Sequence, residues 1–178
     1  MLALVMACQA MAQPAQVIII RHAEKSDEGD ELSLRGRERA AALVPYFLGT
    51  EDFLQFKTPV AIYAQAPKKA TSLIRSLESV QPLAADLHLT VIQTFTRDEY
   101  KRTVEEIMHK KVYDGRMVLI CWEHRVIPDT AADFGVEDAP KTWHGRDFDR
   151  TWVITFRPDK KPEFEDLPQH LMYGNSDD

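Results

Sequence analysis

The sequence predicts an α/β fold, because short apolar segments alternate along the chain with segments of helical periodicity. The clearest apolar segment is Val-Ile-Ile-Ile at residues 17–20, and a second one spans residues 117–122. Apolar runs of this length are typical of strands that are buried on both faces, as in parallel sheets. Charged residues follow each of these two segments at once. We therefore expect a buried, mostly parallel sheet with polar groups at its carboxyl edge.

Between these two strands, the sequence predicts a helix, a strand and a second helix. Ser33 is placed to cap the first helix, whose apolar residues recur at helical spacing: Ala40, Leu43, Val44 and Phe47. Residues 60–63 form the expected strand. The next helix has an apolar face that contains Leu73, Leu77 and Val80. We expect Pro82 to break this helix and to open a new first turn, because proline lacks the N–H that a helix interior uses.

The alternation continues on either side of the second apolar strand. Residues 89–92 have the pattern of a short strand. Thr96 and Glu99 then form a capping box for a helix whose apolar face contains Tyr100, Val104 and Ile107. After the strand at 117–122, Pro128 is expected to open a short helix and Gly135 to end it.

The chain is expected to hold one domain, residues 13–157. Its 178 residues are enough for one sizeable core and too few for two ordinary domains. The last expected strand spans residues 152–156. Residues 158–178 are rich in Pro, Asp and Lys, so we expect a loosely held C-terminal tail.

The overall charge restricts the classes of partner. A net charge of −6 and an isoelectric point near 5.5 argue against nucleic acid or an anionic membrane as the main partner. No segment of the sequence is long and apolar enough to span a bilayer. Local basic groups must therefore hold any anionic ligand.

Residues 1–12 resemble the end of a secretory signal peptide. They contain an apolar run and an Ala-Met-Ala sequence before Gln13, although the usual basic start is missing. The sequence therefore predicts export to the periplasm or the medium, or a cytoplasmic protein if this leader is not a signal. Cleavage before Gln13 would remove Cys8 and leave Cys121, which we expect to be a buried strand thiol, so no disulfide could form within the mature chain.

Basic residues follow both strong strands. Arg21 and His22 come directly after the first, and Glu123, His124 and Arg125 follow the second. Arginine provides a permanently charged fork for oxyanions, and a histidine that is neutral near pH 7 can act as a nucleophile or base. Alone, such a pair would also fit an ion pair at the sheet edge. Two strand ends with such residues favour a single phosphate site over an isolated ion pair.

Four ordered blocks carry a more specific pattern. Arg-His-Ala at residues 21–23 precedes Leu-Ser-Leu-Arg-Gly-Arg-Glu-Arg-Ala at 32–40. Ile-Tyr-Ala-Gln at 62–65 precedes a block at 75–84 with Arg, Ser and Pro in register, and Glu-His-Arg at 123–125 follows. These blocks resemble the histidine phosphatase superfamily, also called phosphoglycerate-mutase-like. Its corresponding blocks are Arg-His-Gly, Leu-Thr-x-x-Gly-x-x-Gln-Ala, Tyr-Ala-Ser with Arg-x-x-x-Thr-x-x-Pro-Leu-Ala, and Ser-His-Gly.

The resemblance implies a three-layer α/β/α sandwich with a mostly parallel central sheet, and a phosphatase that needs no metal or other cofactor. It implies that His22 is the nucleophile that forms a phosphohistidine. Arg21, Arg75 and His124 would then hold the phosphoryl oxygens. Lys69 competes with Arg75 for the second arginine position, but the residues after Lys69 do not match the block.

The proton donor for the leaving group is left open. The resemblance points to Asp98 or Glu99, yet Glu99 is also explained as a capping residue, and Asp98 lies where a helix dipole favours a carboxylate. Glu123 is a third candidate, unless it pairs with Arg125. An enzyme without a dedicated acid is the fourth possibility.

Two further positions have alternative interpretations. Arg125, which replaces a glycine of the pattern, could add an anion contact, fill the crevice or extend outward over Trp122. Residues 143–149 could rim the site or simply pack against the last strand.

Three functions fit these observations. The first is a phosphatase that hydrolyses phosphomonoesters through a phosphohistidine on His22. The second is a phosphohistidine protein phosphatase, so the expected partner is a phosphorylated small molecule or a phosphoprotein. The third is a catalytically weak phosphate-binding module. A mutase is disfavoured, because the short middle section leaves little room for an enclosing lid.

Overall fold

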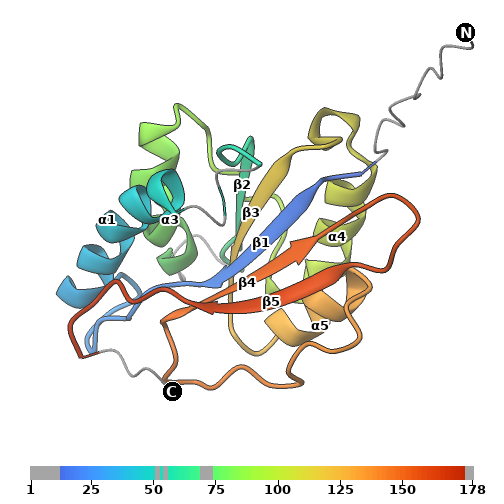
Figure 1. Ribbon diagram of the computed structural model, residues 1–178. Helices are drawn as coiled ribbons and strands as arrows, with labels where there is room; N and C mark the ends of the chain where they lie inside the picture. The colour runs from blue at the N-terminus through green and yellow to red at the C-terminus, as the bar shows by residue number, and fades with distance from the viewer. Residues whose placement is uncertain (1–12, 51–52, 54–55, 69–73, 175–178) are drawn as a thin grey trace, which may run out of the picture.

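The computed structural model describes residues 13–50, 53, 56–68 and 74–174. Within these residues one five-stranded sheet has the order β2-β3-β1-β4-β5 (Figure 1). Its strands are β1 (Gln16–Arg21), β2 (Ala61–Ala64), β3 (Met117–Trp122), β4 (Arg150–Thr155) and β5 (Glu163–Pro168). β2, β3 and β1 are parallel, whereas β4 and β5 are antiparallel to their neighbours. The sheet is therefore mixed. The expected parallel arrangement holds for β2, β3 and β1, and the predicted site residues Arg21 and His124 lie at the carboxyl ends of β1 and β3.

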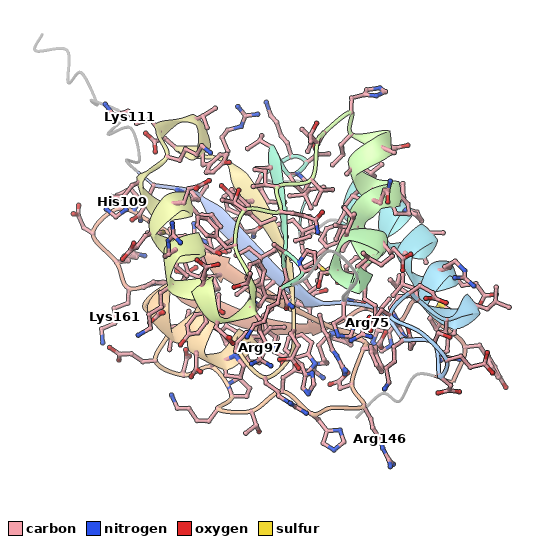
Figure 2. The ribbon with its side chains drawn as sticks, turned by 180° about the vertical axis from the view of Figure 1, so that it is seen from behind. Arg75, Arg97, His109, Lys111, Arg146 and Lys161 are labelled. Atoms are coloured by element: carbon pink, nitrogen blue, oxygen red, sulfur yellow. The ribbon has the colours of Figure 1, made fainter. Side chains whose placement is uncertain are left out.

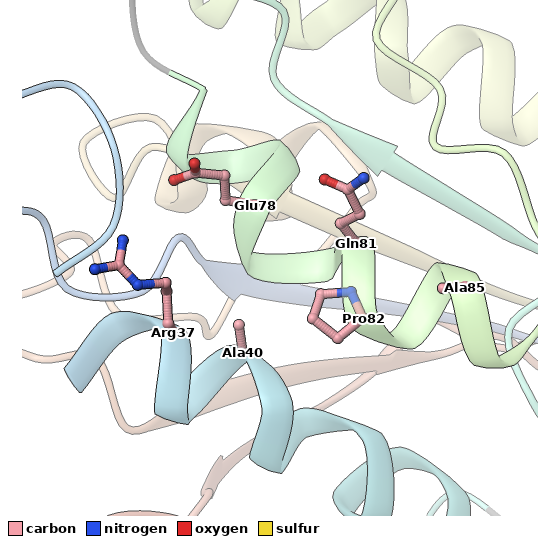
Figure 3. Close-up of a pocket in the computed structure, with 6 residues that line it drawn as sticks. All are labelled: Arg37, Ala40, Glu78, Gln81, Pro82 and Ala85. Carbon is pink, nitrogen blue, oxygen red and sulfur yellow. The ribbon is translucent and has the colours of Figure 1, made fainter. Parts of the chain in front are cut away.

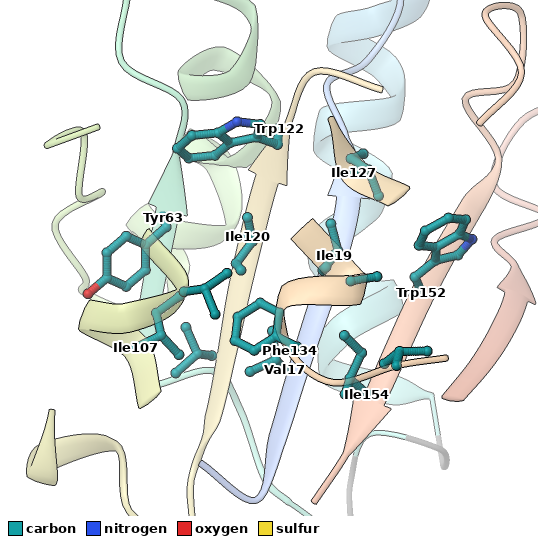
Figure 4. Packing of buried hydrophobic residues seen from close by; sticks show 14 of the residues in the cluster. Val17, Ile19, Tyr63, Ile107, Ile120, Trp122, Ile127, Phe134, Trp152 and Ile154 are labelled. Atoms are coloured by element: carbon teal, nitrogen blue, oxygen red, sulfur yellow. The ribbon is translucent and has the colours of Figure 1, made fainter. Parts of the chain in front are cut away.

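Helices cover both faces of the sheet and create the predicted three layers (Figure 1). On one face lie α1 (Leu34–Gly49) and α3 (Arg75–Asp86), and on the other lie α4 (Tyr100–His109) and α5 (Ile127–Asp133). Successive side chains of a strand point to opposite faces. Accordingly, Val17 and Ile19 of β1 pack in the core beneath α4 and α5 (Figure 4), and Ile18 and Ile20 pack beneath α1 and α3.

Several predicted helix ends are confirmed. The Ser33 side chain accepts a hydrogen bond from the N–H of Gly36 and caps α1. Glu99 accepts from the N–H of Thr96 in a capping box, although the helix begins there with a 3₁₀ turn, η1 (Arg97–Glu99), before α4. Pro128 lies in the first turn of α5, and Gly135 follows that helix with a φ of 89°. These local rules act within one turn of the chain, so sequence alone could predict them.

The predicted break at Pro82 is wrong, because α3 continues through it to Asp86. Proline removes one helical hydrogen bond, and the carbonyl of Glu78 is the group that loses its donor. The helix persists because its inward face, which includes Val80, Leu83 and Ala84, is fully packed against α1 and the sheet. Tertiary packing therefore outweighs the local cost. Leu73, predicted on the same face, lies outside the described residues.

Residues 89–92 also differ from the prediction. They form no strand, and only Ile92 makes an isolated parallel bridge, to Tyr63 of β2. A second isolated bridge joins Ala66 to Thr96. This segment runs beside the edge strand β2 without a continuous ladder, and it leads the chain directly to the capping box of α4.

The predicted C-terminal tail is largely ordered. Its residues 163–168 form β5, which pairs with β4 along six residues. Ion pairs join the two strands at Arg150–Asp166, and Arg157 pairs with Glu163 at the strand's start. An edge strand with one exposed face is rich in charge, and composition alone does not distinguish it from a flexible tail.

The predicted leader, residues 1–12, lies outside the described residues. Across the part of the chain that is described, no helix is both long and apolar enough to cross a bilayer. Cys121 is fully buried in β3, and burial raises the pKa of its thiol to about 12, in agreement with the expected inert strand cysteine.

Candidate active site

The two charged strand ends meet at one edge of the sheet. β1 and β3 are parallel neighbours, and Arg21 is paired in register with Trp122. The N–H of His22 donates to the carbonyl of Trp122 at 3.2 Å. His22 therefore lies beside Glu123 and His124, as the two motifs predicted, although about a hundred residues separate them in the sequence.

His22 is fixed in one neutral form. Its Nδ1 lies 2.8 Å from the carbonyl oxygen of Ala23, and since a carbonyl only accepts, Nδ1 carries the proton. The Nε2 atom therefore keeps its lone pair. The side chain is 6% exposed, and burial lowers the pKa of the imidazole to about 4; Arg21, Arg75 and His124 add to this shift, whereas the Ala23 carbonyl opposes it. The imidazole of His22 is thus neutral near pH 7, with an unprotonated Nε2 atom.

Arg21 is held from two sides by the chain that precedes β4. Its Nη1 donates to the carbonyls of Gly145 at 2.8 Å and Asp147 at 3.1 Å, and its Cζ lies 3.8 Å from the ring centroid of Phe148. Burial lowers the pKa of the guanidinium to about 10, opposed mainly by Glu123, so Arg21 is still cationic near neutral pH. Both interpretations of residues 143–149 thus hold in part: Gly145, Asp147 and Phe148 contact Arg21, whereas Trp143 packs against Trp152 of β4.

Arg75, the first residue of α3, is connected through Ser79 to the segment that follows His22. The Ser79 hydroxyl donates to the carbonyl of Arg75 at 2.7 Å and accepts from the N–H of Ala23 at 2.7 Å. The guanidinium Nη1 lies 4.0 Å from Oδ1 of Asp30, and burial lowers its pKa. One hydroxyl therefore fixes α3 against the residue that follows His22. Lys69, the competing candidate, lies outside the described residues.

His124 lies between a carboxylate and the backbone of the opposite loop. Its Nδ1 is 2.9 Å from Oε1 of Glu123, but the two atoms lack the alignment of a hydrogen bond. Burial and Arg21 lower the pKa of His124, whereas Glu123 raises it. A Cβ on Gly145 would lie 3.5 Å from Nε2 of His124, so this glycine sits directly against the ring.

Arg125 extends outward from the site. Its side chain is 74% exposed, and its Nε lies 3.8 Å from Oε1 of Glu123. A side chain this exposed does not fill the crevice, whereas an anion contact by Arg125 stays a prediction. Figure 2 shows the neighbouring cations Arg75, Arg97 and Arg146 toward the same end of the molecule, away from His109 and Lys111.

Asp98 and Glu99 are both engaged in other interactions. Asp98 is exposed and pairs with Lys68 and Arg97, and these partners, Lys68 first, lower its pKa. Glu99 accepts from the N–H and hydroxyl of Thr96 and pairs with Arg102; the contacts with Thr96 are the main cause of its lowered pKa. A general acid needs a raised pKa, so neither carboxyl has the environment of a proton donor.

Several polar side-chain atoms at the site have no hydrogen-bond partner among the described residues. The Nε atoms of Arg21 and Arg75 and the Nδ1 of His124 are buried without a hydrogen-bond partner among the described residues. Gln65, at the carboxyl end of β2, adds a buried amide whose Oε1 also has no partner there. Buried polar groups are normally satisfied, so a cluster of unsatisfied donors is typical of a site that receives an anion. No group of three or more metal-ligating side chains is found in the described residues.

A buried charge network supports this site, and our sequence reasoning missed it. Arg39 of α1 pairs with Glu24 at 2.8 Å and with Asp149 at 3.1 Å, so it connects the segment after His22 to the chain before β4. A signal was present in the sequence: Arg39 lies on the same helical face as Gly36, Ala40 and Leu43, where a charge requires a buried partner.

A groove of about 380 Å³ lies elsewhere, between α1 and α3 (Figure 3). Its lining residues are Arg37, Ala40, Glu78, Gln81, Pro82 and Ala85. It contains none of the residues predicted for the site.

Comparisons with known proteins support the fold. No protein-family model matches the sequence, and a comparison with curated proteins gives no match. Among solved structures, the chain resembles a protein from Agrobacterium tumefaciens with a provisional assignment as the phosphohistidine phosphatase SixA. The TM-score is 0.58 at 14% identity, over 86% of this chain and 98% of that one.

Two other phosphatase structures are similar. The mycobacterial glucosyl-3-phosphoglycerate phosphatase Rv2419c gives a TM-score of 0.53 at 14% identity, over 86% of this chain and 95% of that chain. The α-ribazole phosphatase from Shigella flexneri gives a TM-score of 0.53 at 15% identity, over 80% of this chain and 91% of that chain. All three are members of the histidine phosphatase superfamily. The predicted phosphoglycerate-mutase-like α/β/α fold is therefore confirmed.

Proposed function

We propose that this protein is a phosphatase that transfers the phosphoryl group of a phosphomonoester to His22 and then to water. The observation that carries the proposal is the neutral His22, with its Nε2 lone pair near the buried Arg21 and the half-buried Arg75, each of which has an Nε atom without a partner among the described residues. The similar structures named above are described as phosphatases, which supports the same class of reaction.

The chemistry needs a nucleophile, a charge clamp and a leaving group. Nε2 attacks phosphorus, the N–P bond forms, the P–O bond to the leaving group breaks, and the leaving-group oxygen takes up a proton from Glu123 or from solvent. The proton on Nδ1 stays hydrogen-bonded to the Ala23 carbonyl, which stabilises the positive charge that the ring gains. Water then attacks phosphorus, the N–P bond breaks, inorganic phosphate leaves and His22 regains its neutral form.

Arg21, Arg75 and His124 are proposed to bind the three phosphoryl oxygens. Charge-assisted hydrogen bonds from preorganised donors stabilise the transition state most strongly where water is excluded; Arg21 is buried and Arg75 is half-buried. Arg125, at the exposed rim, is placed to contact a substrate group beyond the phosphoryl. This arrangement requires no metal ion.

The environment of the carboxylates favours a phosphohistidine substrate as the second candidate. Asp98 and Glu99 are ion-paired with lowered pKa values, so they are poor proton donors. Glu123 is the carboxyl group nearest His124 and is the best-placed candidate for the acid. A phosphohistidine in a protein needs little protonation of its leaving group, so an enzyme without a strong acid would prefer it to an alkyl phosphate.

The first experiment measures hydrolysis of para-nitrophenyl phosphate by the purified protein in EDTA. His22→Asn is the test variant, and His109→Asn, an exposed histidine at the end of α4, is the matched control. We expect activity in the wild type and in the control and none in His22→Asn. A phosphohistidine protein and glycerol phosphate, tested in parallel, distinguish the two substrate classes.

Three other outcomes would change the assignment. Activity that EDTA abolishes would contradict metal independence. If the His22→Asn variant were as active as the wild type, His22 would not be the nucleophile. A wild-type protein that binds phosphate but hydrolyses none of the three substrates would be a binding module.

We further propose that residues 1–12 are a signal sequence and that the mature protein is exported. N-terminal sequencing of the protein purified from its native cells would test this, since cleavage predicts a chain that starts at Gln13. A chain that retains residues 1–12 in the cytoplasm would contradict it.

A further inference from the structure

We propose that Phe148 is a positioning residue that holds Arg21 in the orientation needed to bind the phosphoryl group. The inference rests on the proposed function and names a residue that the sequence pattern did not assign. Phe148 lies in the segment between α5 and β4, two residues before β4 begins. It acts through Arg21 and is not assigned a chemical step.

Among the guanidinium nitrogens of Arg21, Nη2 is the one that remains available to bind a ligand. Both N–H groups of Nη1 are used by backbone carbonyls, those of Gly145 and Asp147. Nε is buried without a partner among the described residues. One face of the guanidinium is covered by the Phe148 ring, with 3.8 Å between Cζ and the ring centroid. Nη2 is therefore the donor available to a phosphoryl oxygen, and its direction depends on the plane that the ring imposes.

Phe148 is itself held by its neighbours in the chain. The carbonyl of Asp147 accepts from Nε1 of Trp143 at 2.9 Å, and the carboxylate of Asp147 accepts from the N–H of Asp149 at 3.0 Å. Asp149 is paired with the buried Arg39. The ring therefore lies between two anchored residues, and Arg21 packs against a prearranged surface.

The same ring also faces the nucleophile. The ring centroids of Phe148 and His22 lie 6.4 Å apart, with an interplanar angle of 58°. Phe148 thus separates the pair formed by His22 and Arg21 from solvent on one side. A shorter aliphatic side chain would expose that face of Arg21 to water, which weakens electrostatic interactions with an anion.

The test compares Phe148→Leu with Phe148→Tyr in the full-length protein. Affinity for inorganic phosphate is measured by isothermal titration calorimetry. The kinetic constants kcat and KM are measured with para-nitrophenyl phosphate as the substrate. Phe164→Leu is the matched control, because Phe164 is a half-buried aromatic of β5 that packs edge-on against Trp152, away from Arg21. We expect Phe148→Leu to lower phosphate affinity and kcat/KM by about 5- to 30-fold, the range of a desolvated cation–π contact. Phe148→Tyr and Phe164→Leu should stay within about 2-fold of the wild type.

A double-mutant cycle with Arg21→Ala separates positioning from general destabilisation. If Phe148 acts through Arg21, Phe148→Leu causes no further loss of phosphate affinity in the Arg21→Ala background. An equal loss in both backgrounds would overturn the inference. Phe148→Met, which fills a similar volume without a ring face, replaces Phe148→Leu if circular dichroism shows that the leucine variant does not fold.

The outcomes also separate this inference from the proposed function. A wild type that hydrolyses phosphomonoesters through His22, with an unchanged Phe148→Leu variant, would overturn the role of Phe148 alone. A wild type that neither binds phosphate nor hydrolyses any substrate would overturn the proposed function and this role with it.

Discussion

The N–H of His22 donates to the carbonyl of Trp122, one residue beyond the last register pair of β1 and β3. This hydrogen bond extends the parallel ladder by one residue beyond β1. It holds the backbone of His22 beside that of Trp122, and His124 is close enough for its charge to lower the pKa of the His22 imidazole. The meeting of the two motifs is therefore set by the register of β1 and β3, because each motif directly follows one of these strands.

The first prediction concerns the protonation of His22. Because burial and neighbouring positive charges lower its pKa to about 4, His22 should titrate well below the usual value for histidine. An NMR titration of the ring protons should give a midpoint near 4, and the neutral, nucleophilic form should dominate at pH 5 and above. Arg75→Leu removes a positive charge and should move the midpoint upward. A midpoint near 6.5 would mean that the site is more hydrated than this structure.

The second prediction concerns the charge clamp. Arg75→Ala should lower kcat/KM about 100-fold, equivalent to about 3 kcal/mol of transition-state stabilisation, because a preorganised donor to the phosphoryl group is lost. Arg157→Ala removes an arginine that pairs with Glu163 at the start of β5, and it should leave steady-state kinetics unchanged. Equal kinetics in the two variants would exclude Arg75 from the clamp.

The third prediction concerns Gly36, which packs against the segment that follows His22. A Cβ at this position would lie 2.2 Å from the carbonyl oxygen of Glu24, a backbone atom that cannot move aside easily. Gly36→Ala should therefore destabilise the protein by about 1–3 kcal/mol in urea unfolding. Gly49→Ala is the matched control in the same helix, since its Cβ meets no atom within 4 Å. Helix propensity predicts a change between zero and a gain of about 1 kcal/mol for that control. Similar losses in both would show that the close contact does not limit stability.

The fourth prediction concerns the buried network of Arg39. Arg39→Met leaves the carboxylates of Glu24 and Asp149 without their shared cation, which should cost about 3–5 kcal/mol of unfolding free energy. Arg35 pairs with the same Glu24 but is half exposed, so Arg35→Met should cost less than about 1 kcal/mol. Urea denaturation of both variants provides the comparison. A loss of unfolding free energy below about 1 kcal/mol for Arg39→Met would mean that water solvates the carboxylates of Glu24 and Asp149 in place of the guanidinium.

The fifth prediction concerns the proton donor. Asp98→Asn and Glu99→Gln should change kcat by less than about 2-fold, because both carboxyls already serve in ion pairs or a cap. Glu123→Gln should lower kcat for glycerol phosphate more than for para-nitrophenyl phosphate, whose leaving group needs less protonation. A loss of about 100-fold in Asp98→Asn, within the usual range for general acid catalysis, would return the acid role to Asp98.

The features that the sequence predicted correctly depend on short-range rules. The apolar run at residues 17–20 indicated a buried strand, Ser33 indicated a helix start, and Gly135 indicated a helix end. Each prediction depends on hydrogen bonds or side-chain alternation within a few residues. The candidate histidines and arginines were also visible, because each strong strand ends in them.

The features that the sequence did not predict depend on contacts between distant segments. Packing against α1 and the sheet keeps α3 intact through Pro82. Pairing with β4 turns charged residues of the expected tail into β5. Both outcomes follow from free energy that is gained only once the whole domain has assembled.

The sequence by itself determined that this protein has an α/β fold with Arg21, His22 and His124 at strand ends, because alternation and strand periodicity are local. Only the tertiary structure decided that Nδ1 of His22 is protonated, that Phe148 covers Arg21, and that Arg39 joins Glu24 to Asp149. The physical reason is that burial and charge act through space. A pKa, a cation–π contact and a buried ion pair all depend on which groups the fold brings within a few ångströms.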